Sequence, residues 1–170
     1  MIRYLDLREV DGGTLLGYLG HLAENLRPSD VDELSATVGT PAMQALVESV
    51  IASQRAWIIL ADEEPVCIFG AADTEHPGAG CVWMMGTPRM DERAVALSIC
   101  RSFHAYLAEL HQLWPLLFNF IDARNQKSMR WLAWGGFQII EALPRFGREG
   151  RLFFTFTRYD PQCAPLSSQP

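Results

Sequence analysis

The chain has 170 residues and a formal net charge of −6, and 49% of its residues are hydrophobic while 20% are charged. This balance is typical of one globular domain with a sizeable core and differs from that of disordered chains. The acidic charge argues against nucleic-acid binding, because phosphate contacts require clustered Lys and Arg side chains. We expect neither a signal peptide in residues 1–10 nor a membrane span, since the apolar stretches are too short to cross a bilayer.

The cysteine and histidine residues predict no metal site. No two cysteines have CxxC spacing, and a chain of this size folds without disulfide bonds, so free thiols in a reducing cytoplasm fit best. His104 and His111 share one predicted helix without an acidic third ligand, which favours structural or surface roles. The cysteines are Cys67, Cys81, Cys100 and Cys163.

The N-terminal part of the chain predicts a short strand followed by three helices. Residues 2–7 alternate in polarity, and the segments after them carry apolar residues at helical spacing. Ser29 is a candidate N-cap for the second helix, and Thr40 is one for the third, with Pro41 at the first helical position. The expected helices cover residues 14–26, 30–38 and 41–54.

From residue 56 onward the pattern predicts a mixed sheet. Three apolar runs separated by turns form an antiparallel meander, and the long helix after it makes the next strand parallel to its neighbour through a right-handed crossover. A short helix and a C-terminal hairpin complete the domain. The expected strands cover residues 56–61, 66–72, 81–85, 116–121, 138–143 and 151–157, and the helices cover 91–113 and 125–134.

The prolines near the C-terminus set the expected domain boundary. Residues 160–170 carry three prolines and show no periodicity, which predicts a flexible tail outside the core. Residues 1–159 are therefore expected to form one α/β domain.

The most specific pattern of the chain follows the strand that contains Asn119. Asn125 stands at the start of a short helix, Ser128 follows three positions later, and Gly136-Phe137 closes the segment. The Asn side chain can cap the helix, the small Ser lets a ligand or backbone approach, and the Gly lets the chain reverse into the hairpin. With the order of the elements, these residues resemble the GNAT superfamily of N-acetyltransferases. The resemblance implies the GNAT-like mixed sheet, with its meander, parallel crossover strand and hairpin, and a site for acetyl-CoA.

The second half of the chain resembles one group within this superfamily more closely. Residues 114–134 and 150–157 are most similar to the short GNAT-fold proteins of tailed bacteriophages, including internal virion proteins. This resemblance implies a virion-associated or host-interaction role, protein partners among phage virion proteins, and a location in the bacterial cytoplasm or the virion.

The resemblance places the cofactor contacts at the end of strand 81–85, at the start of the long helix and in the short helix. In GNAT enzymes, backbone N–H groups of a Gly-rich loop bind the diphosphate of acetyl-CoA at this helix start. Here Pro88 lacks an N–H, and Asp91 and Glu92 bring negative charge to the helix start. We therefore favour a self-capped helix start over a divergent anion loop. The implied cofactor residues are Met85, Gly86, Arg89, Arg93, Asn125 and Ser128.

The groups that would move protons are missing from their usual places. Leu132 occupies the position at which the family commonly has an acidic Tyr, and strand 81–85 carries no carboxylate. Asp73, Glu75 and His76 follow the preceding strand and are candidates to face the cleft. Nothing in the sequence brings Tyr106 or Tyr159 to the site. The catalytic residues therefore stay unassigned.

Two functions are considered, and the missing tyrosine, the absent glycine loop and the strand without a carboxylate favour the first. The first is a phage-derived GNAT-fold protein with degraded catalysis, and the second is an active acetyl-CoA-dependent N-acetyltransferase of a small amine or a protein amino group. A sensor that binds a CoA ester without turnover lies between them. The pairs Trp131 with Trp134 and Phe153 with Phe154 are candidate contacts to a protein partner or a second copy of the chain.

Overall fold

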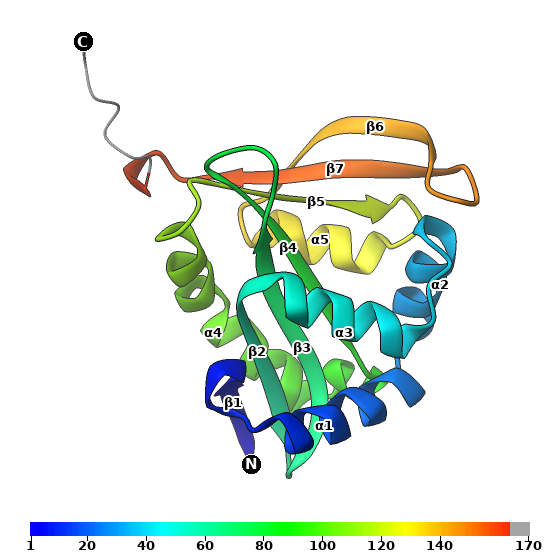
Figure 1. Cartoon of the computed structure of the whole chain (residues 1–170). Coiled ribbons are helices and arrows are strands. Elements are labelled where there is room, and N and C mark those ends of the chain that lie inside the picture. Colours follow the sequence, from blue (N-terminus) through cyan, green and yellow to red (C-terminus); the bar gives the residue numbers. More distant parts are fainter. Residues whose placement is uncertain (164–170) are drawn as a thin grey trace.

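The computed structural model describes residues 1–163, which form a seven-stranded mixed sheet in the order β1-β2-β3-β4-β5-β7-β6, with helices on both faces (Figure 1). Neighbouring strands are antiparallel except for β4 and β5, which are parallel. The predicted meander, crossover strand and C-terminal hairpin are thus confirmed. The strands are β1 (Ile2–Asp6), β2 (Ser53–Ala61), β3 (Glu64–Asp73), β4 (Ala79–Gly86), β5 (Leu116–Asp122), β6 (Gln138–Phe146) and β7 (Arg151–Tyr159).

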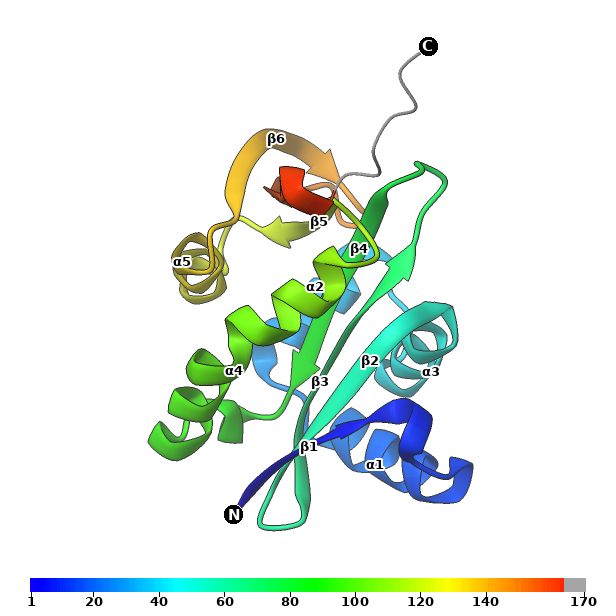
Figure 2. The same ribbon diagram turned by 90° about the vertical axis from the view of Figure 1, so that its left-hand side faces the viewer.

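The helices divide between the two faces of the sheet (Figure 2). Helices α1 and α3 cover one face over Ile58, Leu60 and Met85, while α4 and α5 cover the other. Strands β2 and β3 are apolar along most of their length because both of their faces are buried. The helices are α1 (Gly12–Glu24), α2 (Pro28–Thr37), α3 (Ala42–Ala52), α4 (Arg93–His111) and α5 (Gln126–Trp134), with 3-10 turns at Leu7–Glu9, Pro88–Asp91 and Pro161–Cys163.

Two of the predicted helix caps are wrong and one is confirmed. Helix α2 begins at Pro28, so Ser29 lies inside its first turn, and α3 begins after Pro41 without a cap from Thr40. Proline fixes its own φ and needs no hydrogen-bond acceptor, so a helix can begin there without a side-chain cap. In α5, by contrast, the Asn125 side chain accepts a hydrogen bond from the Ser128 amide at 3.2 Å.

Strands β4 and β5 separate soon after they meet. They pair over three residues, from Ala79 opposite Leu116 to Cys81 opposite Phe118. At the point of separation, the Asn119 side-chain amide donates a hydrogen bond to the Val82 carbonyl oxygen at 2.6 Å. The sheet is therefore open at its centre, between the β4 side and the β5-β7-β6 side.

The last described residues remain attached to the domain. The Asp160 amide donates a hydrogen bond to the Pro115 carbonyl oxygen at 2.8 Å, and Pro161–Cys163 form a 3-10 turn. The rest of the expected tail, residues 164–170, lies outside the described residues. None of the helices in the described part of the chain is long and apolar enough to cross a membrane.

Candidate functional site

A cavity of about 400 Å³ lies where β4 and β5 separate. Alternate side chains of β4 point to opposite faces of the sheet, so Val82 and Met84 line the cavity from the α4 side, while Trp83 and Met85 line it from the α3 side. The cavity therefore passes through the sheet and has walls on both of its faces. Its volume lies in the range of small-molecule sites.

The half of the cavity between α4 and α5 is a narrow, mostly apolar groove. Ile99, Cys100 and Phe103 of α4 form one wall, and Ser128 and Trp131 of α5 form the other. The rings of Phe103 and Trp131 lie 4.3 Å apart and fix the spacing of the two helices. Such a groove suits a slender chain with few polar groups.

The start of α4 is not capped by a side chain. Glu92 is the N-cap residue and makes no side-chain cap, whereas Thr87 caps the preceding 3-10 turn. The first-turn amides of α4 therefore have no acceptor within the helix and form a site that favours an anion. The expected self-capped start is wrong for α4, because the local acidic residues engage other partners.

The acidic residues at this helix start are compensated by basic ones. Asp91 forms an ion pair with Lys127 of α5, and Arg89 donates to Glu92 at 2.9 Å and to Glu64 at 2.7 Å. Asp91 and Glu92 thus each have a basic partner, which weakens the repulsion of an anion at this position.

The structure brings together only part of the cofactor site implied by the sequence. Met85, Asn125 and Ser128 line the cavity. Arg89 points toward the β2–β3 turn, where it also donates to the Ala61 carbonyl oxygen, and Arg93 is exposed outside the lining. Gly86 is the last residue of β4, beside the cavity, and its backbone amide and carbonyl oxygen already form hydrogen bonds.

The start of α2 is attached to the end of β4 through Gly86. The Gly86 amide donates to the Asp30 carboxylate at 2.9 Å, and the Gly86 carbonyl oxygen accepts from the Arg27 amide at 2.8 Å. Asp30 is only 6% exposed and also pairs with the Arg27 guanidinium at 2.7 Å. A ligand can use the Gly86 amide only if the start of α2 moves.

Glu33 lies one turn further along α2, on the wall of the cavity. Its carboxylate accepts a hydrogen bond from the Asn125 side-chain amide at 2.8 Å. Burial raises the pKa of Glu33 to about 7, against the hydrogen bond from the Asn125 side chain, which lowers it. The negative charges of Asp30 and Asp122 also raise this pKa, while a hydrogen bond from the Asp122 backbone lowers it. A carboxyl group that titrates near neutral pH in a cavity is a candidate general base. The sequence analysis did not identify Glu33 as a site residue. The signal that could have found it is its spacing of three residues from Asp30, which places both carboxyl groups on one face of the same helix.

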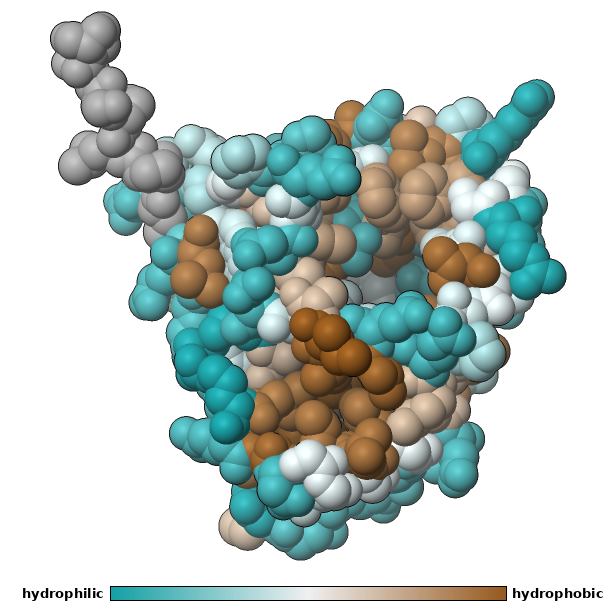
Figure 3. All heavy atoms as spheres, viewed as in Figure 1, coloured by the Kyte–Doolittle hydropathy of each residue, from teal (hydrophilic) through white to brown (hydrophobic). Residues whose placement is uncertain are grey.

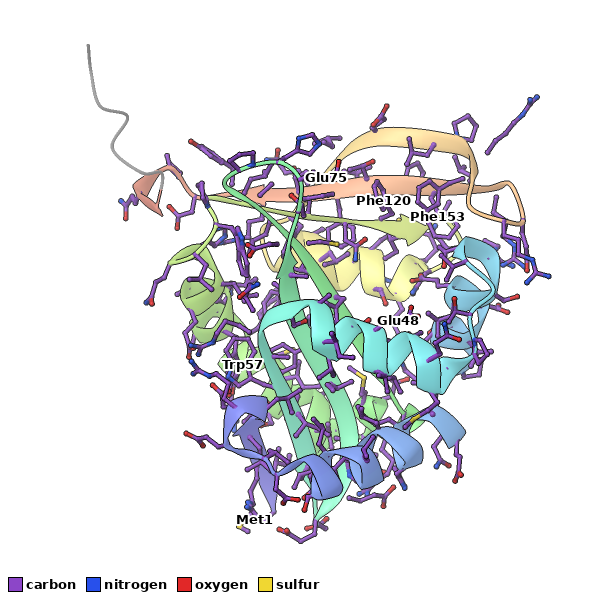
Figure 4. All side chains as sticks on the ribbon, viewed as in Figure 1. Met1, Glu48, Trp57, Glu75, Phe120 and Phe153 are labelled. Carbon is purple, nitrogen blue, oxygen red and sulfur yellow. The ribbon has the colours of Figure 1, made fainter. Side chains whose placement is uncertain are left out.

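The expected acidic and basic groups after β3 lie elsewhere. Asp73 accepts a hydrogen bond from the Trp114 indole at 2.8 Å and borders a separate polar depression with Arg8 and Arg55. Glu75 projects from the exposed β3–β4 loop (Figure 4). Neither these residues nor His76 line the cavity, so the expectation that they face the cleft is wrong.

Tyr106 lines the cavity from α4, although no sequence pattern placed it at the site. Burial raises the pKa of Tyr106 to about 12, so its phenol stays protonated at neutral pH. Leu132 lies in the cavity wall at the position where the family commonly has its acid, and it supplies no proton. Residues 1–163 contain no cluster of His, Cys, Asp and Glu that could hold a metal ion.

The aromatic pairs singled out in the sequence take different positions. Trp131 and Trp134 share a helix face, because both rings contact Phe103, although Trp134 is 52% exposed. Phe153 is buried against Phe146, and Phe154 packs from the opposite face of β7.

No family model matches this sequence, and no curated protein matches it. Solved structures nevertheless share its architecture. The ribosomal-protein-S5-alanine acetyltransferase of Vibrio fischeri is 11% identical with a TM-score of 0.66, covering 95% of this chain and 96% of that one. The ribosomal-protein-S18-alanine N-acetyltransferase of Escherichia coli is 9% identical with a TM-score of 0.64, covering 94% of both chains. A ribosomal L7/L12 alpha-N-protein acetyltransferase in complex with coenzyme A is 9% identical with a TM-score of 0.66, covering 88% of this chain and 90% of that one.

The likeness extends over nearly the whole chain and defines the fold. This protein has the fold of the GNAT acetyltransferases, with the strand order and the parallel β4–β5 contact described above. At 9% to 11% identity, the similarity concerns architecture, and the activity has to be argued from the site.

Proposed function

We propose that this protein is an acetyl-CoA-dependent N-acetyltransferase in which Glu33 is the general base. The observation that carries the proposal is the Glu33 carboxyl group, with its pKa near 7, on the wall of a cavity that passes through the sheet. The fold adds support, because the similar structures include acetyltransferases and one complex with coenzyme A.

The residues on the α4–α5 side fit the cofactor. The uncapped amides at the start of α4 would hold the diphosphate. The groove between α4 and α5, lined by Ile99, Cys100 and Ser128 beside the Phe103–Trp131 contact, would hold the pantetheine chain. Lys127 lies next to that helix start through its ion pair with Asp91 and adds positive charge. When bound, acetyl-CoA supplies an acetyl group activated as a thioester.

On the opposite side, Glu33 would act on the acceptor. An amine is an ammonium ion at neutral pH and becomes a nucleophile only after it loses a proton. The ionised Glu33 carboxylate accepts that proton, and the Asn125 amide holds one of its oxygens in place. Tyr106 keeps its own proton at neutral pH and is one of two phenols in the cavity wall, the other being Tyr4, whose hydroxyl is hydrogen-bonded to Ser98.

The proposal is tested by measuring CoA release with a panel of amines, together with calorimetric titration of acetyl-CoA. We expect micromolar binding and a turnover that falls at least about a hundredfold in Glu33→Gln, as for the loss of a general base. Asp32→Asn, at an exposed neighbouring position of α2, serves as the matched control. Absence of binding at millimolar acetyl-CoA would end the proposal.

A second candidate is a phage-derived, virion-associated protein with degraded catalysis. Two observations favour it, namely the Asp30 carboxylate on the Gly86 amide and Leu132 in the place of an acid. Its partners would be phage virion proteins or a second copy of the chain, and its location the bacterial cytoplasm or the virion. The same titration separates the candidates, because this one predicts no heat with acetyl-CoA.

A further inference from the structure

A row of phenylalanine rings covers one face of the β5-β7-β6 part of the sheet. The rings of Phe118 and Phe120 on β5 lie 6.1 Å apart, and the Phe120 and Phe146 rings lie 4.7 Å apart. Phe146 in turn contacts the buried Phe153 at 4.9 Å. Phe118, Phe120 and Phe146 are only partly buried, so this phenylalanine row has apolar surface to offer.

The phenylalanine row reaches the acceptor side of the cavity through Phe120, which is the member of the row in the cavity lining. Cys81 pairs with Phe118 across the parallel contact, so Phe118 and Phe120 share the sheet face of Trp83, which is the α3 side. Phe120, Trp83 and Glu33 all line the cavity. Figure 3 shows this face hollowed between α3 and the strands β5 and β6, with apolar atoms along the upper wall. Figure 4 shows Phe120 on β5 above this region and Glu48 on α3 below it.

Glu33 differs from the neighbouring carboxyl groups because it has no cationic partner in the described residues 1–163. Asp30 is paired with Arg27, and Asp122 is paired with Arg124. Within residues 1–163, Glu33 forms no salt bridge and has the neutral Asn125 amide as its hydrogen-bond partner. A ligand ammonium group beside Glu33 would therefore meet a charge with no internal counterion.

The far end of α2 is joined to the β6–β7 turn. The Arg148 amide donates to the Thr37 carbonyl oxygen at 2.8 Å, and the Glu149 amide donates to the Ala36 carbonyl oxygen at 3.1 Å. Gly147 has φ +68°, and a Cβ atom there would lie 2.4 Å from the Ala36 carbonyl oxygen, so the two segments are in close contact. A contact at this place hinders a polypeptide from continuing past Glu33 on the α2 side, which favours a small molecule.

We propose that the acceptor is a small primary amine that carries an aromatic group. Its nitrogen lies at Glu33 and its ring lies against the phenylalanine row. The assignment rests on the proposed acetyltransferase function. The ammonium ion gives one proton to Glu33, and the amine nitrogen then bonds to the acetyl carbon as the C–S bond breaks. The nitrogen loses its second proton, and the leaving thiolate takes that proton up. The products are the N-acetyl amine and CoA.

The test compares 2-phenylethylamine, n-butylamine and 2-phenylethanol as ligands of the full chain, by ligand-observed NMR for binding and by CoA release for turnover. We expect 2-phenylethylamine to bind and react about tenfold better than n-butylamine, because ring–ring contacts add affinity. 2-Phenylethanol should bind weakly because it lacks the ammonium group. Phe120→Ala should remove the preference for the ring, while Leu152→Ala, at an exposed apolar position of β7 outside the cavity lining, should keep it.

The outcomes separate this inference from the proposed function. Equal acetylation of n-butylamine, or faster acetylation of a peptide N-terminus than of 2-phenylethylamine, would overturn the aromatic acceptor and leave the acetyltransferase standing. Phe120-dependent binding of 2-phenylethylamine without CoA release would support the groove as the amine site and overturn the acetyltransferase. No binding of 2-phenylethylamine at millimolar concentration would overturn the inference.

Discussion

The Asp30 carboxylate accepts a hydrogen bond from the Gly86 amide at 2.9 Å, although the two residues lie 56 positions apart in the sequence. This contact holds the start of α2 against the end of β4, at the edge of the cavity. The same carboxylate pairs with Arg27, so one buried group satisfies both a backbone donor and a guanidinium. Asp30 therefore stabilises the fold and at the same time limits access to the Gly86 amide.

Replacing Asp30 should separate these two effects. In Asp30→Ala, the Gly86 amide and Arg27 lose their acceptor, and the free energy of unfolding should fall by about 3 kcal/mol. If the cofactor uses the Gly86 amide, the affinity for acetyl-CoA should rise several-fold in the fraction that remains folded. Urea unfolding and calorimetric titration measure the two effects. Asp32→Ala, at an exposed position of the same helix, is the control and should change neither.

The pH dependence of turnover should report the ionisation of Glu33. Because the pKa of this carboxyl group is raised to about 7, the base is protonated below that pH and ionised above it. We expect kcat/KM to rise with pH and to level off above about pH 7 for the free enzyme. A profile that is flat between pH 5.5 and 8.5 would contradict the assignment of Glu33 as the base.

The same raised pKa has a consequence for stability. Glu33 titrates near its ordinary value of 4.5 in the unfolded chain and near 7 in the fold, so the folded state binds more protons between these pH values. The free energy of unfolding should therefore fall as the pH rises from about 4.5 to 7, and the part due to Glu33 is on the order of 2–3 kcal/mol. Urea unfolding at pH 5, 6, 7 and 8 should show a shallower decline for Glu33→Gln than for the wild type. Equal slopes for the two proteins would contradict the shift.

The sequence predicted those parts of this site that depend on local patterns. The meander, the crossover strand and the Asn125 cap follow from apolar runs, the long amphipathic helix and a side chain that bonds three residues ahead. The general base could not be predicted in this way. Glu33 contacts Asn125, which lies 92 positions away in the sequence, and its pKa is raised because the fold buries its carboxyl group. The direction of Arg89 was missed for a similar reason, since its partner Glu64 lies 25 positions away.

We expect Lys127 to favour cofactor binding by neutralising Asp91 at the start of α4. Without the lysine, the Asp91 carboxylate would stand uncompensated near the first amides of α4 and repel a diphosphate. We expect Lys127→Met to weaken acetyl-CoA binding by about fivefold, with the effect shrinking in high salt because exposed charges are screened. Arg89→Met should have a smaller effect, because this guanidinium is held by Glu64 and Glu92 away from the cavity. Equal losses for the two variants would show that Arg89 also reaches the cofactor.

Asn125 connects the helix cap to the base and allows the two roles to be separated. Its side-chain oxygen accepts from the Ser128 amide, while its side-chain nitrogen donates to Glu33. Serine keeps a capping oxygen but cannot reach in the same way to Glu33, so Asn125→Ser should retain most of the stability of α5. Loss of the hydrogen bond to the charged carboxylate should raise the pKa of Glu33 further, because that bond opposes the effect of burial. The rise of kcat/KM with pH should therefore shift to higher pH in Asn125→Ser. An unshifted profile with lower activity would mean that Asn125 acts on the substrate and not through Glu33.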